Sequence, residues 1–250
     1  MKLLSLVLAA ASCSVSLHAH PTTNDAQNAS TSPLVERAWR PQDAKLKLRM
    51  GEAKQHVGSI SGEDMYWFVR NSLTELCTPE KCTKPASLGD EHCCNGGINM
   101  FPFIQYKNKG GHSANNAYLK LEVVSSSIFG NDADIKNLMF MTIAETYKRE
   151  VVNQGANCYA QTFTDGKSAR FCNVGQKVDL AIAYQNLETR LTFNGNTEFG
   201  TADCADWKEE AWTGLNLYKP SFFEKSGLDT SRGDPFPVTL ECCDAKKKCS

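Results

Sequence analysis

Ten cysteines in the exported part of the chain constrain its fold more than any other feature. The 250-residue sequence contains 11 cysteines, of which Cys13 lies in an N-terminal segment with the pattern of a signal peptide. The other ten are Cys77, Cys82, Cys93, Cys94, Cys158, Cys172, Cys204, Cys242, Cys243 and Cys249. Because this number is even, every cysteine can pair, and an exported chain with such a count is expected to fold around disulfides. Zinc sites are less favoured, because no Cys-x-x-Cys spacing occurs.

Two pairs of these cysteines are adjacent in the sequence. Cys93 precedes Cys94, and Cys242 precedes Cys243. A disulfide between neighbours strains the peptide that joins them, so we expect the two cysteines of each pair to bond outward to different partners. The full connectivity stays open, since spacing alone does not determine it.

Residues 1–19 have the three parts of a secretory signal peptide. Lys2 supplies the positive charge, residues 3–11 form an apolar run, and Ala19 ends a small-residue motif of the kind that signal peptidase recognises. The apolar run is much shorter than the roughly 20 residues that cross a bilayer, and no later segment approaches that length. We therefore expect a secreted, extracellular protein without a stable membrane anchor.

Residues 20–49 are expected to be a disordered pro-segment. The segment is rich in Thr, Asn, Ser, Ala and Pro, has Trp39 as its one aromatic residue, and lacks cysteine. Such a composition buries too little apolar surface to order a chain. Asn28 begins an Asn-Ala-Ser sequon and is the candidate N-glycosylation site.

Two Leu-x-x-Arg sequences in this segment end at Arg37 and Arg49. They resemble the processing sites in the pro-regions of secreted fungal effectors and toxins, where a kexin-type protease cleaves after the arginine. The resemblance implies a mature protein that begins near Met50 and keeps all ten cysteines.

The periodicity of the remaining chain predicts an α+β fold. Ser61 and Asp64 resemble a capping box, and apolar residues at spacings of three and four follow, so residues 62–76 are expected to be a helix. A second helix is expected from Asp132 or Asp134 to Val151. Alternating residues and turn signals predict strands at 100–107, 117–125, 158–164, 168–174, 177–184, 189–193, 214–218 and 236–242.

The order of these elements indicates two parts. Residues 50–110 are expected to be a cysteine-rich N-terminal part led by a helix. Residues 111–250 are expected to be a β-rich C-terminal part, in which one helix packs on a mostly antiparallel sheet. The whole is therefore predicted to be a disulfide-rich α+β protein.

No motif for catalysis stands out. The chain lacks Gly-x-Ser-x-Gly, and an even cysteine count leaves no spare thiol to act as a nucleophile. Asp90, Glu91 and His92 form the densest polar cluster, but their position beside Cys93 favours the solvated edge of a disulfide loop. The histidines lack metal-ligand spacing, so we expect no metal and no cofactor.

Two enzyme hypotheses stay open. The chain has many carboxylates, and a pair at a suitable separation in space can cleave a glycosidic bond. In addition, cleavage after Ala19 would expose His20 as the N-terminal residue, which resembles the copper brace of lytic polysaccharide monooxygenases. Coincidence is the favoured interpretation of His20, because Pro21 follows it and the expected processing would remove it.

Arg232, Gly233 and Asp234 form the one candidate binding motif. They lie in a polar stretch before Pro235, where a loop tip is expected. The tripeptide resembles the integrin-type adhesion motif that one family of fungal host-selective toxins displays on an exposed loop. A structural turn is the alternative interpretation of the same residues.

The layout of the whole chain points to a class of function. Its 27 Lys and Arg balance 28 Asp and Glu, which leaves no basic excess for binding nucleic acid. A signal peptide, a processed pro-segment and a ten-cysteine body resemble secreted fungal effectors and proteinaceous toxins, in particular the dual-domain cysteine-rich effectors of vascular-wilt fungi. The resemblance implies a monomeric, non-enzymatic virulence protein that binds a host protein in the apoplast or after uptake. The alternative is a secreted enzyme acting on cell-wall polysaccharide.

Overall fold

The computed structural model describes residues 46–78, 82, 99–127, 133–152, 157–182, 185–195, 204–225, 238–244 and 249. All of them belong to one compact unit, Trp39–Ser250. The strands are β1 (Leu46–Gly58), β2 (Met100–Lys107), β3 (Ser113–Ser127), β4 (Cys158–Thr162), β5 (Ser168–Ile182), β6 (Gln185–Phe193) and β7 (Val238–Cys243). The helices are α1 (Gly62–Leu76), α2 (Ala133–Val152) and α3 (Cys204–Lys225).

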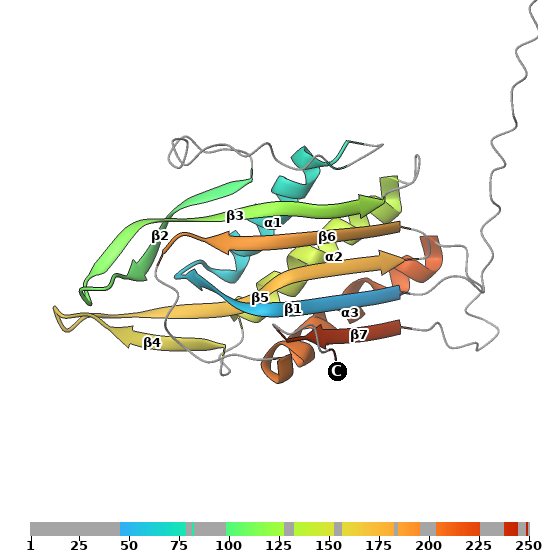
Figure 1. Ribbon diagram of the computed structural model, residues 1–250. Helices are drawn as coiled ribbons and strands as arrows, with labels where there is room; N and C mark the ends of the chain where they lie inside the picture. Colours follow the sequence, from blue (N-terminus) through green and yellow to red (C-terminus); the bar gives the residue numbers. More distant parts are fainter. Residues whose placement is uncertain are drawn as a thin grey trace, which may run out of the picture. The chain divides into compact units, whose positions relative to one another are not determined.

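The strands form a single sheet in the order β2-β3-β6-β5-β1-β7, and β4 pairs with the beginning of β5 (Figure 1). Neighbouring strands are antiparallel except for β1 and β7, which are parallel. The predicted α+β class and mostly antiparallel sheet are therefore confirmed. Because β2 and β3 pair with each other, the two parts expected on either side of residue 110 contribute to one sheet.

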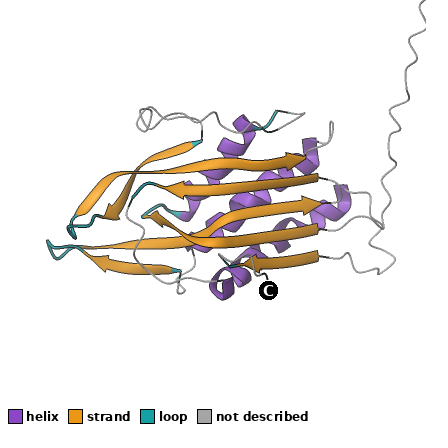
Figure 2. Ribbon diagram, in the orientation of Figure 1, coloured by secondary structure: helices purple, strands orange, loops and turns teal. Residues whose placement is uncertain are grey.

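The three helices lie against one face of the sheet (Figure 2). α2 is in the middle and contacts both α1 and α3. The strands alternate in burial, and Leu48, Leu180 and Leu191 on their helix-facing side are fully buried. No helix among the described residues covers the opposite face, which we call the open face.

Both predicted helices are present. α1 spans the expected residues 62–76, and the Oγ of Ser61 caps it by accepting a hydrogen bond from the N–H of Asp64 at 3.1 Å. α2 begins and ends within one or two residues of its predicted limits, and its apolar residues Met139 and Ile143 are fully buried. Capping chemistry and a repeat near 3.6 residues were sufficient signals for both helices.

A third helix replaces a predicted strand. α3 contains residues 214–218, for which local alternation predicted a β-strand, and that prediction is wrong. Trp207, Ala211 and Leu215 recur every four positions and are buried, so a window longer than five residues shows a helical period. Two helices of the C-terminal part therefore pack on the sheet, where one was expected.

The first described element is a strand, β1, whose residues 46–49 fall in the expected disordered pro-segment and whose residues 50–58 were not predicted to be a strand. β1 begins at Leu46 and lies between β5 and β7. Leu46 and Leu48 are fully buried, while Lys47 and Arg49 point to the open face. The expected disorder of residues 46–49 is therefore wrong, because their alternation of leucine with charge is the period of a half-buried strand. Cleavage after Arg49 would cut this strand.

Four disulfides join described cysteines: Cys77–Cys82, Cys158–Cys172, Cys204–Cys242 and Cys243–Cys249. The prediction for the adjacent pair Cys242 and Cys243 is confirmed, because Cys242 bonds to α3 and Cys243 bonds toward the C-terminus. Cys93 and Cys94 lie outside the described residues.

Glycines allow β1, β5 and β7 to approach one another closely near the middle of β1. Gly51 has a φ of 106°, and a Cβ there would lie 2.3 Å from the carbonyl oxygen of Cys243 on β7. A Cβ at Gly175 on β5 would lie 3.0 Å from the backbone nitrogen of Gly51. Any larger residue at Gly51 would therefore combine a steric clash with left-handed backbone strain.

Candidate functional site

The open face of the sheet carries charged side chains on neighbouring strands. In β1 the residues that alternate with buried apolar residues are Lys47 and Arg49, and in β5 they are Lys177 and Asp179. In β6 Glu188 takes the equivalent position. The period-two pattern of a strand thus places apolar residues toward the helices and ionisable groups toward the open face.

One row of this face crosses five strands. Glu241 on β7 is the register partner of Arg49 on β1, and Arg49 is also the partner of Asp179 on β5. Asp179 in turn pairs in register with Glu188 on β6, and Glu188 pairs with Ser125 on β3. Register partners on neighbouring strands point to the same face and lie about 5 Å apart. The row therefore places three carboxyl groups and one guanidinium along a line perpendicular to the strands.

Ion pairs hold the two ends of the row. Glu241 accepts from Lys47 at 2.7 Å and from the Nε of Arg49 at 3.2 Å. These contacts, the one to Lys47 foremost, lower the pKa of Glu241. At the other end Glu188 pairs with Lys177 at 2.9 Å and accepts a hydrogen bond from the Oγ of Ser125 at 3.1 Å. Burial acts to raise the pKa of Glu188, but these partners outweigh it and leave the pKa below its usual value.

Asp179, between the two ends, has a different environment. Its Oδ1 is buried and accepts no hydrogen bond from any described residue. Burial raises the pKa of Asp179, and the negative charge of Glu188 across the strand pair raises it further, against the pull of Arg49. Two carboxyl groups that face each other thus differ in their tendency to keep a proton.

A hollow of about 400 Å³ lies over this part of the row. Its walls are Arg49, Met50, Lys177, Asp179, Glu188 and the disulfide Cys243–Cys249. The volume is in the range of small-molecule sites, and the lining offers both carboxylate acceptors and cationic donors. Because the helices lie on the other side of the sheet, the hollow opens away from the apolar core.

The hollow does not have the ligands of a metal centre among the described residues. Glu241, Cys243 and Cys249 bring one ligand atom each within 4.8 Å of one another, but the two sulfurs are bonded to each other. A disulfide sulfur is not the thiolate that a metal requires. Most of the other charged side chains of the hollow form ion pairs, so the hollow suits an organic ligand better than a metal ion.

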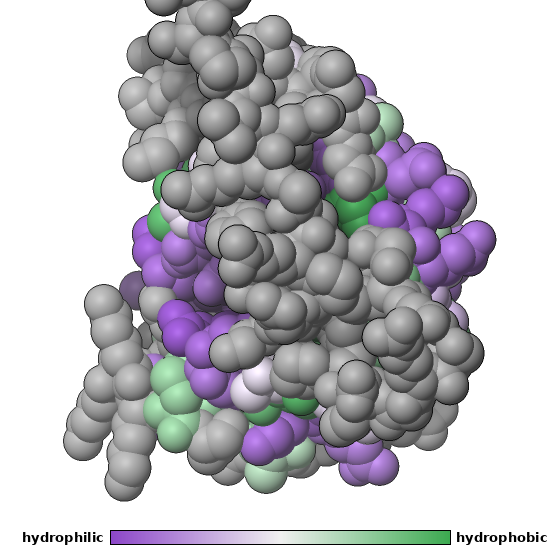
Figure 3. All heavy atoms as spheres, turned by 90° about the vertical axis from the view of Figure 1, so that its right-hand side faces the viewer, coloured by the Kyte–Doolittle hydropathy of each residue, from purple (hydrophilic) through white to green (hydrophobic). Residues whose placement is uncertain are grey.

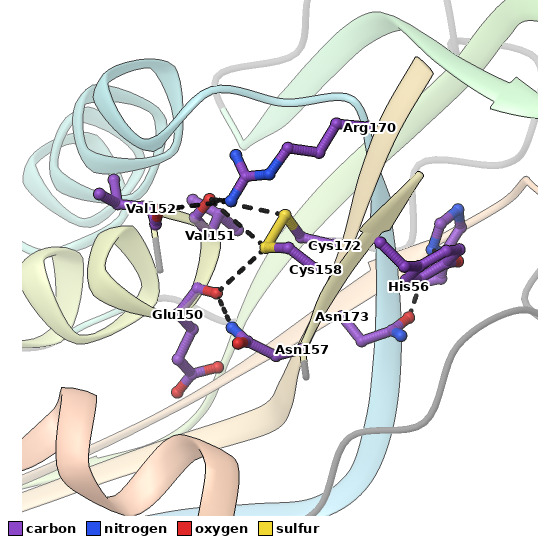
Figure 4. Close-up of a disulfide and its surroundings, with 10 residues drawn as sticks. His56, Glu150, Val151, Val152, Asn157, Cys158, Arg170, Cys172 and Asn173 are labelled. Carbon is purple, nitrogen blue, oxygen red and sulfur yellow. Dashed lines mark hydrogen bonds between the residues drawn. A yellow bond between two sulfur atoms is a disulfide. The ribbon is translucent and has the colours of Figure 1, made fainter. Parts of the chain in front are cut away.

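A second polar cluster lies in the interior (Figure 4). His56 is 1% exposed, and its Nδ1 lies 3.3 Å from Asn173 Oδ1 and 3.3 Å from the hydroxyl of Tyr159. Burial lowers the pKa of His56 to about 4, against the hydrogen bond to Asn173, so the ring is neutral. With so little exposure, His56 has a role in packing rather than in binding from solvent.

The same interior region fastens the end of α2 to the sheet. Arg170 on β5 donates to the carbonyl oxygens of Val151 at 3.1 Å and of Val152 at 3.3 Å. Glu150 is fully buried, and its Oε2 accepts the N–H of Gly175 at 2.7 Å. Burial raises the pKa of Glu150 well above its usual value. These contacts stabilise the packing of a helix end and leave the open face as the candidate site.

Apart from the cysteines, most residues that the sequence singled out lie outside the described residues. These are Arg232, Gly233, Asp234, Asn28, Arg37, His20, Asp90, Glu91 and His92. Of the remainder, Arg49 lies in the hollow rather than in a flexible segment. His112 is exposed in a turn, where its Nδ1 contacts the Oγ1 of Thr164 at 2.7 Å.

Sequence reasoning did not find Lys177, Asp179 and Glu188. A signal was present for Lys177 and Asp179, because they are charged residues at alternate positions of the strand predicted at 177–184. Glu188 lies just before the strand predicted at 189–193 and was left outside it. What the sequence lacked was the register that brings them together with Arg49 from a distant part of the chain.

Comparisons with known proteins do not extend this description. No family model, no curated protein and no solved structure matches the chain. The proposals below therefore depend on the chemistry of the residues themselves.

Proposed function

We propose that this protein is a secreted fungal effector or toxin, that it acts by binding a host protein, and that the open face of the sheet is its binding surface. The observation that carries the proposal is the charged row Glu241–Arg49–Asp179–Glu188 on a face without a covering helix among the described residues.

The framework of the molecule supports an extracellular role. Four disulfides join described cysteines, and each is expected to contribute about 2–4 kcal/mol by restraining the unfolded chain. Such crosslinks form and persist in oxidising compartments. None of the described helices is long and apolar enough to span a membrane.

The charge pattern favours a polar partner. Arg49 and Lys177 lie among the three carboxyl groups Glu241, Asp179 and Glu188, so the face offers complementary sites for charges of both signs. Complementary charges steer association and suppress wrong partners more than they add raw affinity. The end of the molecule where β1 and β7 begin is likewise mostly hydrophilic in its described part, with small apolar patches (Figure 3).

The test compares two charge-reversed variants on host plant tissue. Lys47→Glu with Arg49→Glu inverts the two cations that pair with Glu241 at one end of the row. Lys109→Glu with Lys167→Glu makes the same charge change in exposed turns. Each protein is infiltrated over a concentration series, and ion leakage and the suppression of an elicited response are both recorded. We expect the row variant to need at least tenfold more protein than wild type, with the turn variant unchanged.

Two results would contradict the proposal. Equal potency of the row variant would exclude the open face, and the absence of both responses with wild-type protein would exclude an effector. Substitution of Asp234 by Glu, which keeps charge but alters the adhesion-like tripeptide, tests the competing binding loop. A loss confined to that variant would move the binding surface to residues 232–234.

A further inference from the structure

The hollow on the open face contains two carboxyl groups in a geometry that proteins use for chemistry. Asp179 on β5 and Glu188 on β6 are direct register partners of an antiparallel pair. Side chains in that relation have Cβ atoms about 4.5–5.5 Å apart and point to the same face. From such Cβ positions the carboxyl groups of an aspartate and a glutamate can reach the separation of about 5–5.5 Å that retaining glycosidases hold between their two carboxyl groups.

Their surroundings give the two groups different tendencies to keep a proton. Glu188 is 2.9 Å from the ammonium of Lys177 and accepts the hydroxyl of Ser125, and both contacts stabilise a carboxylate. Asp179 has a buried oxygen without a hydrogen-bond donor among the described residues, and it faces the negative charge of Glu188. A proton on Asp179 relieves both costs. Of the two carboxyl groups, Asp179 is therefore the one that keeps its proton to higher pH, and Glu188 is the one that ionises more readily.

The rest of the hollow suits a neutral sugar. Its two cations are each paired with a carboxylate, Arg49 with Glu241 at 3.2 Å and Lys177 with Glu188 at 2.9 Å, so neither is left to select an anionic ligand. Sugar hydroxyls both donate and accept hydrogen bonds, which matches a lining of carboxylate oxygens and N–H groups. The volume of about 400 Å³ holds one or two sugar rings.

We propose that Asp179 and Glu188 are the acid and the nucleophile of a glycosidase site that cleaves neutral oligosaccharides. Asp179 donates its proton to the glycosidic oxygen as the bond from that oxygen to C1 breaks, and Glu188 attacks C1 to form a glycosyl ester. Water then attacks C1, its proton returns to Asp179, and Glu188 leaves as a carboxylate. One water is consumed for each bond cleaved, and the enzyme is regenerated.

The activity is independent of the proposed binding of a host protein, although both use the open face. The test uses the purified, disulfide-bonded protein with aryl glycosides of glucose, xylose and N-acetylglucosamine. It also uses cello-, xylo-, laminari- and chito-oligosaccharides. We expect turnover of at least one series, with a bell-shaped pH profile that reports the two carboxyl groups.

Substitutions separate the two roles. Glu188→Ala should lower kcat by roughly 10²–10⁴, and added azide should restore release of the aryl group with formation of a glycosyl azide. Asp179→Asn should lower turnover of oligosaccharides strongly but spare aryl glycosides with good leaving groups, because those need no acid. Neither result would follow from a merely structural role.

A matched control lies on the same face. Glu122 on β3 pairs with Lys120 at 3.1 Å and does not line the hollow, so Glu122→Gln should leave turnover unchanged. Thermal unfolding of every variant checks that the fold is kept. If no substrate turns over, and no 2-deoxy-2-fluoro glycoside of glucose or xylose labels Glu188 in the intact mass, the glycosidase proposal is overturned. Host responses would still be measured separately.

Discussion

A chain that begins at Met50 is expected to be unable to fold, whereas a chain that begins at Ala38 is expected to fold fully. The two starts correspond to cleavage after Arg49 and after Arg37. Residues 46–49 form the first third of β1, which pairs with β5 on one side and β7 on the other. Their removal would leave two neighbouring strands with unpaired backbone groups and would uncover the core.

The structure gives the size of this effect. Leu46 and Leu48 are each 0% exposed, and burial of one leucine is worth about 1.5–3 kcal/mol. The two together contribute about 3–6 kcal/mol, and each backbone hydrogen bond of the ladder adds about 0.5–1.5 kcal/mol. This sum is comparable with the whole stability of a domain, which is about 5–15 kcal/mol.

Urea unfolding of the secreted proteins, followed by tryptophan fluorescence and circular dichroism, measures the difference. The chain from Ala38 should match full-length protein, and the chain from Met50 should show no cooperative transition. Leu48→Ala in full-length protein should lose about 2–5 kcal/mol, which tests the same packing without truncation. A cooperative transition of the Met50 chain within about 1 kcal/mol of the Ala38 chain would refute the assignment of β1 to the folded core.

Three further outcomes follow from particular contacts. Replacing both Cys204 and Cys242 by alanine removes a disulfide between residues 38 apart and should lower the free energy of unfolding by about 4 kcal/mol. Urea titration under non-reducing conditions measures this loss. An unchanged urea midpoint would contradict the disulfide link between α3 and β7. His56 has its pKa lowered to about 4 by burial, so the unfolded chain binds its proton first and stability should fall by about 3 kcal/mol from pH 6.5 down to pH 4. His56→Gln should remove that part of the pH dependence, and parallel curves for the two proteins would argue against a neutral buried ring. Gly51→Ala should destabilise the fold by several kcal/mol, because its Cβ would lie 2.3 Å from a backbone oxygen. Gly166 also has a positive φ, 80°, but no atom lies within 4 Å of the position of its Cβ, so Gly166→Ala should cost only about 1 kcal/mol. Equal melting temperatures of the two variants would contradict the close approach of β1 and β7 at Gly51.

Local signals in the sequence were enough for the elements whose stability is local. The limits of α1 followed from a capping serine and an apolar repeat, and β2 coincides with its predicted residues 100–107. The same reasoning failed where a short window supported two periods, as in residues 214–218 of α3. It also failed at residues 46–49, where the Leu-x-x-Arg motif was interpreted as a processing site although the alternation of leucine with charged residues is typical of a strand.

The site could not be predicted because it depends on register. Arg49 and Asp179 are 130 positions apart in the chain and become neighbours only through the pairing of β1 with β5. Nothing in either local sequence encodes that pairing, which is determined by how the buried faces of both strands meet the helices. The sequence shows the charged residues, but it does not show which of them become neighbours in the sheet.

The environment of Asp179 separates a structural network from a functional one. If Asp179 existed to pair with Arg49, its ionised form would be stabilised, yet its Oδ1 is buried without a donor among the described residues and its pKa is raised, first by burial. For a carboxyl whose pKa is raised in the fold, stability is lost as pH rises from the unfolded value of 3.8 through the folded one. Asp179→Asn should therefore raise the melting temperature at pH 7 and leave it unchanged at pH 3, while it removes the acid of the site. A lower melting temperature at pH 7 would show that the charge of Asp179 stabilises the sheet, and the residue would then be a structural partner of Arg49. A carboxyl group that lowers the stability of the fold is expected where the residue serves a chemical function rather than a structural one.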